Sequence, residues 1–254
     1  PVAGCASCHA TPGAGESGRL MLGGGLELPS PFGLFRVPNI SSHAEDGIGS
    51  WTELEFLNAM QRGVSPEGQH YYPSFPYSSY ARMSLSDIRD LWAFLTTLPP
   101  VEGVSLPHEL EFPFSVRRGV GLWKRLYLRP DWVRDIAATQ AQELRGRYLV
   151  EGPGHCGECH TPRDSLGGLE FEAWLSGAPS MDGEGRVPAI SQSALADWPV
   201  SDLVYYFESG MDPEFDMVGG SMVEVQENLA RLPREDLEAI AAYLKAPVVS
   251  SAAH

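Results

Sequence analysis

Apolar residues recur at helical spacing in short blocks along this chain, and polar residues or prolines bound each block. The first block starts at Thr52, which is followed three residues later by Glu55, the pattern of a helix-capping box. Leu54, Leu57 and Met60 then fall on one helical face. We therefore expect a helix that begins after Thr52 and buries this face.

A second apolar block lies between Ser84 and the pair Pro99–Pro100. Ser84 is suited to cap the start of a helix, and the prolines end it because they lack the backbone N–H of a helical turn. Within the block, apolar side chains repeat every three or four residues: Leu85, Ile88, Leu91, Trp92 and Leu95. The pattern predicts a second amphipathic helix.

The C-terminal half has a similar organisation. We expect a helix near residues 143–150, a helix capped by Ser201 and a last helix with Pro233 in its first turn. The inner faces of the last two are expected to comprise Leu203, Val204 and Phe207, and Leu237, Ile240, Ala241 and Leu244.

Segments about 150 residues apart resemble one another. Pro38-Asn39-Ile40 returns as Pro188-Ala189-Ile190, and the apolar block at 87–95 returns at 236–244. Trp51 has a counterpart in Trp198. Such closely matched spacings indicate a duplicated unit.

Glycine and proline are frequent, at 27 and 21 residues. So many helix breakers indicate short elements joined by long loops, and they exclude a bundle of long helices. A hydrophobic fraction of 43% with 20% charged residues indicates a folded chain with a core. No apolar run approaches the roughly 18 residues that a membrane-spanning helix needs, so we expect no transmembrane segment in this chain.

Acidic residues outnumber basic ones by 33 to 18, which gives a formal net charge of −15. A nucleic-acid partner is not expected, because binding a polyanion requires a basic surface. The charge suits a partner with a basic face, and added salt should weaken that encounter.

All four cysteines fall into two copies of one short motif. Cys5-Ala6-Ser7-Cys8-His9 and Cys156-Gly157-Glu158-Cys159-His160 each place two residues between the cysteines and a histidine directly after them. This is the attachment pattern of c-type haem, in which the thiols form thioethers to the haem and the histidine binds the iron. We therefore expect two covalently bound haem c groups, with His9 and His160 as proximal iron ligands.

Other uses of paired cysteines fit less well. A zinc site built from two such pairs usually spaces them by roughly 15–20 residues, whereas Cys8 and Cys156 are 148 residues apart. A thioredoxin-like redox pair, or a disulfide within each short loop, would not explain a histidine after both motifs.

These observations predict an all-α fold of two tandem cytochrome c-type haem domains with long ordered loops. We expect the first domain over residues 1–102, a connecting segment over 103–143, the second domain over 144–247 and a tail over 248–254. Each domain would pack a few short helices on its haem, since the macrocycle supplies apolar surface that so small a domain lacks.

The ligand on the opposite face of each iron decides the chemistry. With every cysteine used, the candidates are the seven methionines and five other histidines: His43, His70, His108, His155 and His254. Position relative to the last helix of each unit favours Met83, which follows an aromatic loop, and Met222, which follows two glycines. His70 and Met217 are the alternatives.

Several stretches, which together span nearly the whole chain, carry a family resemblance: Phe32–Ser41 through Trp51, Arg62–Gly68, Tyr80–Met83, Gly146–Cys156 with Thr161–Arg163, and Gly220–Met222 ahead of Asp236–Ala241. They are similar to the cytochrome c subunit of bacterial membrane-bound alcohol, gluconate and sugar dehydrogenases. The resemblance implies that Met83 and Met222 are axial ligands. Members commonly carry three haems, whereas this chain has two motifs.

The resemblance implies an electron relay. Members take electrons from a catalytic dehydrogenase subunit and pass them onward, often to membrane quinone or a terminal oxidase. For this chain we expect a donor dehydrogenase subunit and a downstream acceptor that is a cytochrome, a quinone or an oxidase. Because c-type haem is attached after export, we expect a periplasmic protein that associates with a membrane only through a partner.

The connecting segment has no counterpart in the repeat and holds six of the 18 basic residues: Arg117, Arg118, Lys124, Arg125, Arg129 and Arg134. If residues 116–128 are helical, they form an apolar stripe of Val116, Val120, Trp123 and Tyr127. Two interpretations stay open. The segment is either a linker helix with solvated or paired charges, or a basic patch that docks a partner or lies near haem propionates.

Two other classes of protein fit the same motifs. A dihaem enzyme, similar to peroxidases or thiosulfate dehydrogenases, would keep the distal face of one haem open or weakly ligated. This alternative gains if either Met83 or Met222 is not a ligand. A fixed domain of a larger respiratory assembly is the other class, and it predicts co-purification with another subunit.

Overall fold

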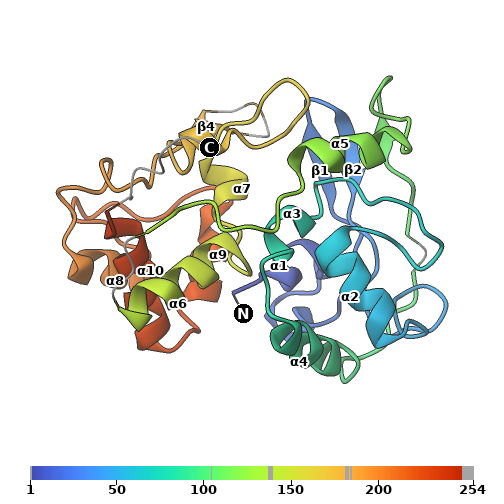
Figure 1. The fold of residues 1–254 in the computed structure, drawn as a ribbon. Helices are drawn as coiled ribbons and strands as arrows, with labels where there is room; N and C mark the ends of the chain where they lie inside the picture. Colours follow the sequence, from blue (N-terminus) through green and yellow to red (C-terminus); the bar gives the residue numbers. More distant parts are fainter. Residues whose placement is uncertain (1, 104, 137–139, 181–182, 184, 248–254) are drawn as a thin grey trace. The chain divides into compact units, whose positions relative to one another are not determined.

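The chain, seen in a computed structural model, divides into two compact units (Figure 1). The N-terminal unit is formed by Cys5–Arg129 and Met181–Glu184, and the C-terminal unit by Pro1–Gly4, Pro130–Ser180 and Gly185–His254. The connecting segment expected from the sequence is thus divided between the two units after Arg129. The structure describes residues 2–103, 105–136, 140–180, 183 and 185–247, so the expected tail over 248–254 and His254 lie outside the described residues.

Short helices and one small sheet build the N-terminal unit. Its helices are α1 (Cys5–His9), α2 (Glu53–Arg62), α3 (Tyr77–Tyr80), α4 (Leu85–Leu95) and α5 (Gly119–Tyr127), with a 3-10 turn at Glu16–Gly18. Its strands are β1 (Glu27–Ser30), β2 (Gly33–Arg36) and β3 (Glu109–Leu110).

The C-terminal unit is also mainly helical. Its helices are α6 (Ala141–Glu151), α7 (Gly157–His160), α8 (Val200–Ser209), α9 (Met222–Leu229) and α10 (Arg234–Lys245), with a 3-10 turn at Phe171–Ala173. Its strands are β4 (Ala178–Pro179) and β5 (Arg186–Val187). In neither unit does the described chain contain a helix with the length and hydropathy to cross a bilayer.

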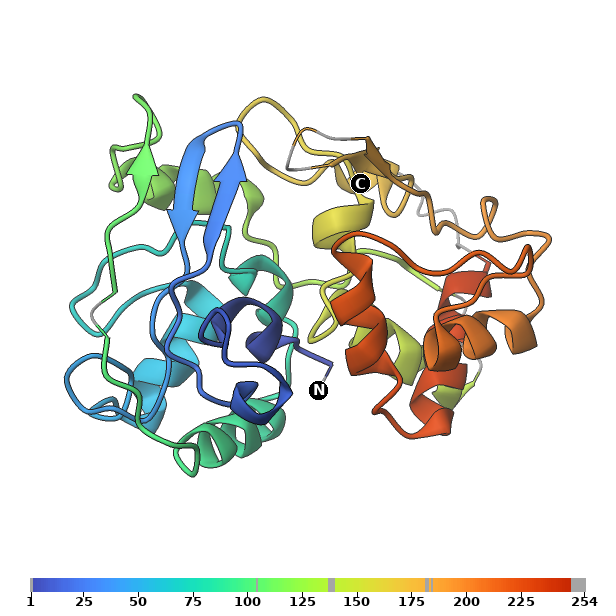
Figure 2. The same ribbon diagram turned by 180° about the vertical axis from the view of Figure 1, so that it is seen from behind.

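The two small sheets correct the expectation of an all-α fold. Strands β1, β2 and β3 form an antiparallel sheet in that order, as Figure 2 shows, and β4 pairs with β5. The third strand comes from the segment expected to be a connector, where Leu110 pairs with Gly33. Gly33 has a positive φ of 120°, and a Cβ there would lie 2.3 Å from the carbonyl oxygen of Glu109. Strand β3 can therefore approach only because this residue is glycine.

The caps of α2 and α4 confirm the sequence prediction. Thr52 and Glu55 form a reciprocal capping box, and the Ser84 side chain accepts from the N–H of Asp87. The predicted inner face of α2 is partly wrong, because Leu54 is 66% exposed. The face that is buried is Phe56, Ala59 and Met60.

Helix starts in the C-terminal unit fall slightly earlier or later than expected. Ser201 does not cap a helix, because α8 begins at Val200 directly after Pro199. Pro233 is the residue before α10 rather than a member of its first turn.

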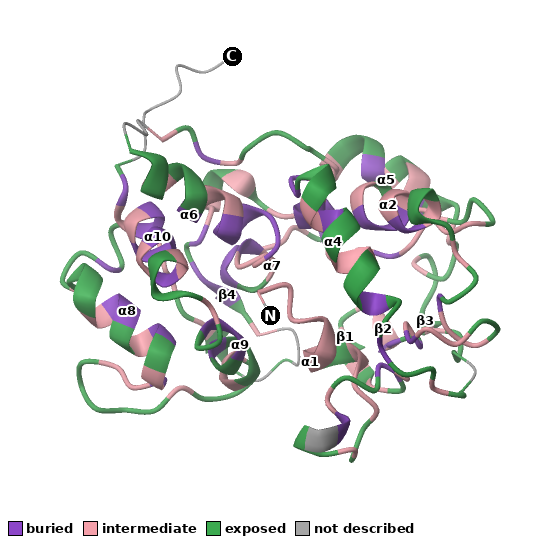
Figure 3. Cartoon of the chain, turned by 90° about the horizontal axis from the view of Figure 1, so that it is seen from below, coloured by how far each residue is buried: buried purple, intermediate pink, exposed green. Residues whose placement is uncertain are grey.

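The core of the C-terminal unit is formed where α6 packs against α10. A Cβ at Gly146 of α6 would lie 1.9 Å from the carbonyl oxygen of Ala239 in α10, so glycine permits this approach. The expected inner face of α10 is buried (Figure 3). Tyr243 of the same helix is buried as well.

Helix α5 of the predicted connector packs on the N-terminal unit. Val120 and Lys124 are its buried residues, and the Lys124 ammonium donates to the carbonyl oxygens of Arg62 and Gly63, at 2.6 Å each. Val116 lies before the helix and is exposed, so it does not join the predicted stripe. The linker-helix interpretation is therefore better supported for Lys124 than a free basic patch.

Candidate haem sites

The first cysteine motif forms helix α1. Cys5 and Cys8 lie one turn apart, and neither is in a disulfide. The Nδ1 atom of His9 lies 2.8 Å from the carbonyl oxygen of Pro38. Because a carbonyl can only accept, Nδ1 carries the proton and Nε2 keeps a lone pair for a metal. Desolvation lowers the pKa of His9 to about 4, so its imidazole is neutral at pH 7.

The second motif has the same arrangement around α7. Neither Cys156 nor Cys159 is in a disulfide, and the Nδ1 atom of His160 lies 2.8 Å from the carbonyl oxygen of Pro188. Burial lowers the pKa of His160 and raises the pKa of the Cys156 thiol to about 12. His160 therefore also presents a neutral Nε2.

Glycine is required inside the second motif. A Cβ at Gly157 would lie 2.0 Å from the ring of Trp174. The indole thus packs directly on the backbone of the motif, and its Nε1 donates to the hydroxyl of Tyr243 at 3.2 Å. This contact connects the second motif to the last helix of its unit.

The loops that present the two proline carbonyls have the same construction. The backbone oxygen of each motif histidine accepts a hydrogen bond from the N–H of a glycine. In each proline loop, the N–H of an isoleucine donates to the carbonyl oxygen of a buried leucine. The bonds run from Gly24 to His9 and from Ile40 to Leu22 in the N-terminal unit, and from Gly177 to His160 and from Ile190 to Leu175 in the C-terminal unit. Each lies between 2.8 and 2.9 Å, so the repeat seen in the sequence is a repeat of site geometry.

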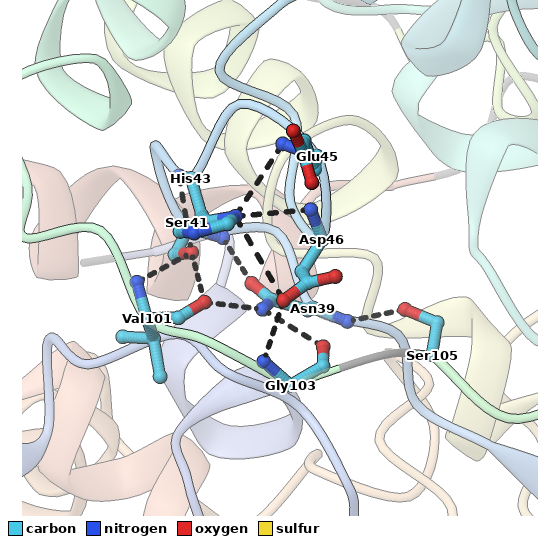
Figure 4. A network of polar contacts seen from close by, with 8 residues as sticks. All are labelled: Asn39, Ser41, His43, Glu45, Asp46, Val101, Gly103 and Ser105. Atoms are coloured by element: carbon cyan, nitrogen blue, oxygen red, sulfur yellow. Dashed lines mark hydrogen bonds and ion pairs between the residues drawn. The ribbon is translucent and has the colours of Figure 1, made fainter.

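A polar network adds support to the loop after Pro38 (Figure 4). The Asn39 side-chain amide donates to the carbonyl oxygen of Val101 at 2.7 Å and accepts from the N–H of Ser41 at 2.9 Å. The Asp46 carboxylate accepts from the N–H of Gly103 at 3.0 Å. The repeat has Ala189 in place of Asn39, so this side-chain support is specific to the N-terminal unit.

Met83 is buried in the N-terminal unit, directly before α4. Its backbone oxygen accepts from the Gln61 side chain at 3.1 Å, and its N–H donates to the carbonyl oxygen of Tyr80 at 2.9 Å. Helix α3 and the residues around it hold this segment. The side chain is 7% exposed, which suits either core packing or an iron ligand.

Met222 is the first residue of α9 and packs against the same core cluster as Cys156. The helix order differs from that around Met83, because α9 stands between Met222 and the last helix, α10. Counted back from the last helix, Leu232 rather than Met222 matches Met83. The two methionines therefore do not have the same place relative to the last helix, contrary to the sequence prediction.

The two alternative ligands lie at equivalent positions on matching turns. His70 pairs with Val64, and Met217 pairs with Met211. The Nδ1 atom of His70 lies 3.2 Å from the Lys124 ammonium, and Met217 is 63% exposed. Neither is as well enclosed as Met83.

The donor chemistry of each motif fits covalently attached haem. Each offers two unbridged thiols on a single turn and one neutral imidazole whose free nitrogen is fixed by a backbone carbonyl. Within the described residues, no three His, Cys, Asp or Glu side chains gather into a group that could hold a metal ion.

The proline carbonyls are functional groups that sequence analysis did not assign. The repeat of Pro38 at Pro188 was a usable signal, but the identity of the hydrogen-bond partner depends on how each loop folds back 28 or 29 residues later onto its motif.

Known proteins resemble this chain over most of its length. The cytochrome c family model matches residues 2–99. The chain is 50% identical to a dihaem cytochrome c-type protein of Cereibacter sphaeroides over 95% of its own length and 81% of that protein. It is 36% identical to the fructose dehydrogenase cytochrome subunit of Gluconobacter japonicus, over 96% of the chain and 50% of that subunit.

A third relative is the cytochrome c subunit of a quinone alcohol dehydrogenase from Gluconobacter oxydans. It is 34% identical over 87% of the chain and 48% of that subunit. The chain therefore spans most of the Cereibacter protein and about half of each dehydrogenase subunit.

Proposed function

The chain belongs to the dihaem c-type cytochromes related to the cytochrome c subunits of membrane-bound quinone dehydrogenases, and from this we propose that it relays electrons from a periplasmic dehydrogenase to a downstream respiratory acceptor. The observation that carries the proposal is the duplicated imidazole geometry. His9 and His160 each donate from Nδ1 to a proline carbonyl at 2.8 Å.

Each unit would hold one haem c through its own residues. Cys5 and Cys8 would form the thioethers in the N-terminal unit, and Cys156 and Cys159 those in the C-terminal unit. When bound, haem iron supplies one-electron chemistry between its ferrous and ferric states. The proline carbonyls keep the imidazoles oriented and raise the basicity of Nε2, which tunes the metal.

We assign Met83 and Met222 as the ligands opposite His9 and His160. Burial of Met83 supports this assignment, as does the packing of Met222 against the same core cluster as Cys156. A neutral thioether sulfur favours reduced iron more than a second imidazole does, which raises the potential. Two side-chain ligands at each iron would leave no coordination position for a substrate.

The partners follow from the relatives. Two of them are described as cytochrome subunits of fructose and alcohol dehydrogenases, so a catalytic dehydrogenase subunit is the proposed electron donor. A cytochrome, a quinone or an oxidase is the proposed acceptor. We place the protein in the periplasm because c-type haem is attached after export.

Optical spectroscopy of the purified holoprotein tests this function. Methionine ligation of both irons predicts a weak band at the red end of the visible spectrum of the ferric protein, low-spin signals from both haems, and no turnover of peroxide. A high-spin signal from one haem, together with peroxide turnover, would contradict the relay and favour the dihaem-enzyme alternative. Isolation from native membranes with the catalytic subunit bound would identify the donor.

A further inference from the structure

Three seven-residue turns in this chain have the same backbone hydrogen bonds. They span residues 64–70, 163–169 and 211–217, and in each the first residue pairs with the last. The second residue of each turn is a serine or an aspartate: Ser65, Asp164 or Asp212. Its side-chain oxygen accepts from the N–H four residues on, at 3.1, 3.1 and 2.8 Å respectively.

The fifth residue of every turn has left-handed backbone geometry. Gly68 and Gly167 fill this position in the first two turns, with φ of 79° and 78°. In the third turn the residue is Phe215, with φ of 67°. A bulky side chain is strained in this region, whereas glycine is not. Glycine at the fifth position would therefore relieve backbone strain in the third turn, yet this chain has phenylalanine there.

Phe215 also gains nothing from burial. It is 80% exposed, and Met217 beside it is 63% exposed. Glu214 and Asp216 flank Phe215 and are exposed as well. The carboxylate of Asp212 is used within the turn, where it accepts from the N–H groups of Glu214 and Asp216. The turn thus presents Phe215 between two carboxylates, with Met217 directly after them.

The charge of the chain is concentrated in the half that carries this turn. Residues 5–129 contain 12 acidic and 10 basic side chains, whereas residues 130–254 contain 21 and 8. An excess of 13 acidic side chains therefore belongs to the C-terminal sequence. Such a field attracts a basic surface and repels an acidic one.

In the matching turn of the N-terminal unit, Glu67, Gly68 and Gln69 are exposed too, but the last residue, His70, is covered. A Cβ at Gly121 of α5 would lie 2.7 Å from the imidazole of His70, at the end of that turn. Lys124 contacts the same imidazole, and Arg117 donates to the carbonyl oxygen of His70 at 3.5 Å. Basic residues of the chain itself thus cover His70, whereas its counterpart on the third turn, Met217, is exposed.

We propose that residues 211–217, with Phe215 and Met217 at their centre, are the docking site for the basic face of a one-electron redox protein. The proposal rests on the proposed function, since only four residues lie between Met217 and Met222, the assigned ligand of the second haem. Aromatic and methionine side chains are enriched in the centres of protein interfaces, and charged rims steer the encounter. Cys156, Cys159 and His160 would hold the haem of this unit, which would exchange one electron with the partner's redox centre in the docked pair, one being oxidised and the other reduced, with no proton transferred.

Binding of mitochondrial cytochrome c, a small lysine-rich haem protein, tests the proposal. Titration calorimetry of the ferric holoprotein at low salt should show a complex that is lost as salt is added. Phe215→Gly should weaken binding roughly five- to tenfold, while the melting temperature stays the same or rises because glycine relieves the backbone strain. This combination separates docking from folding.

Matched variants in the N-terminal unit provide the controls. Glu214→Gln should slow association about two- to threefold at low salt, whereas Glu67→Gln, at the same position of the first turn, should leave it unchanged. Leu54→Gln, which alters an exposed apolar residue of α2, should also have no effect.

Three results would overturn the docking site: no binding by the wild type at low salt, equal binding by Phe215→Gly, or self-association of the wild type that Phe215→Gly abolishes in sedimentation. Binding that persists while the ferrous protein fails to reduce the ferric probe would instead refute the relay and leave the docking site in place.

Discussion

The hydroxyl of Tyr243 donates a 2.6 Å hydrogen bond to the carboxylate of Glu151 in the interior of the C-terminal unit, where both side chains are fully buried. The same carboxylate accepts from the N–H groups of Val133 and Arg134, at 2.6 and 3.1 Å. Burial raises the pKa of Tyr243 well above its ordinary value, and the neighbouring carboxylate adds to the effect. Tyr243 is therefore a neutral donor that holds α10 to the end of α6.

Replacing this donor should destabilise the C-terminal unit. Tyr243→Phe leaves a buried carboxylate and the Trp174 indole N–H each without one partner, which should cost about 1–3 kcal/mol of unfolding free energy. Denaturant unfolding of the holoprotein measures the loss. Tyr205→Phe, at an exposed position of α8, should change it by less than about 0.5 kcal/mol. Equal effects of the two variants would contradict the structural role of Tyr243.

Gly157→Ala should interfere with the second haem site alone. The added Cβ would overlap the Trp174 ring at 2.0 Å, so the indole or the motif must move. The expected result is a purified protein that carries one haem instead of two, measured as intact mass. Ala6 is the matching residue of the first motif, so Ala6→Gly should retain both haems. A Gly157→Ala protein with two haems and unchanged stability would show that Trp174 does not constrain the motif.

Exchange of either proposed sulfur ligand should alter one haem at a time. Met83→His and Met222→His should each lower the midpoint potential of one haem, because imidazole favours ferric iron more than a thioether does. Redox titration followed optically should then resolve one shifted and one unshifted step, with a weaker red-end band. Met60→Leu, at a buried position of α2, should leave both steps in place. A Met222→His protein with wild-type potentials would remove Met222 from the ligand set.

Lys124 should make stability depend on alkaline pH. Desolvation lowers its pKa from 10.5 to about 8. Between these values the unfolded chain binds more protons than the folded one, so the unfolding free energy contributed by this group rises with pH. We expect a rise of up to about 3 kcal/mol between pH 8 and 10.5.

The difference between wild type and Lys124→Met isolates this rise from other titrating groups. Denaturant unfolding at several pH values should show that the difference changes across the window. Arg125→Gln, on the exposed side of α5, should keep the rise, because arginine stays protonated throughout this range. A pH-independent difference would show that the Lys124 ammonium is not desolvated.

Local features of this protein could be predicted from the sequence. The cysteine motifs operate within one helical turn, so the residue order of Cys5 to His9 and of Cys156 to His160 already brings the thiols and the imidazole together. The caps at Thr52 and Ser84 also depend on neighbours only three residues away. The duplication was visible because the repeated motifs carry the same chemistry.

The tertiary structure decided every feature that depends on distant residues. Leu54 and Leu57 have the same periodic pattern, yet only packing determines which side of α2 faces the core, and Leu54 proved to be exposed. From the sequence alone, Lys124 is expected at the surface. In the fold, its ammonium instead donates to the carbonyl oxygens of Arg62 and Gly63, more than 60 residues earlier. Strand β3 likewise exists only because the segment pairs with Gly33.

The same division applies to the sites. Sequence spacing identified His9 and His160, whereas their tautomers are set by carbonyls 29 and 28 residues away. Phe215 looks like an ordinary loop residue until its backbone angle is compared with those of Gly68 and Gly167. Short-range order is determined by covalent geometry and local hydrogen bonds, while burial, tautomer and strain depend on which distant groups the folded chain brings into contact.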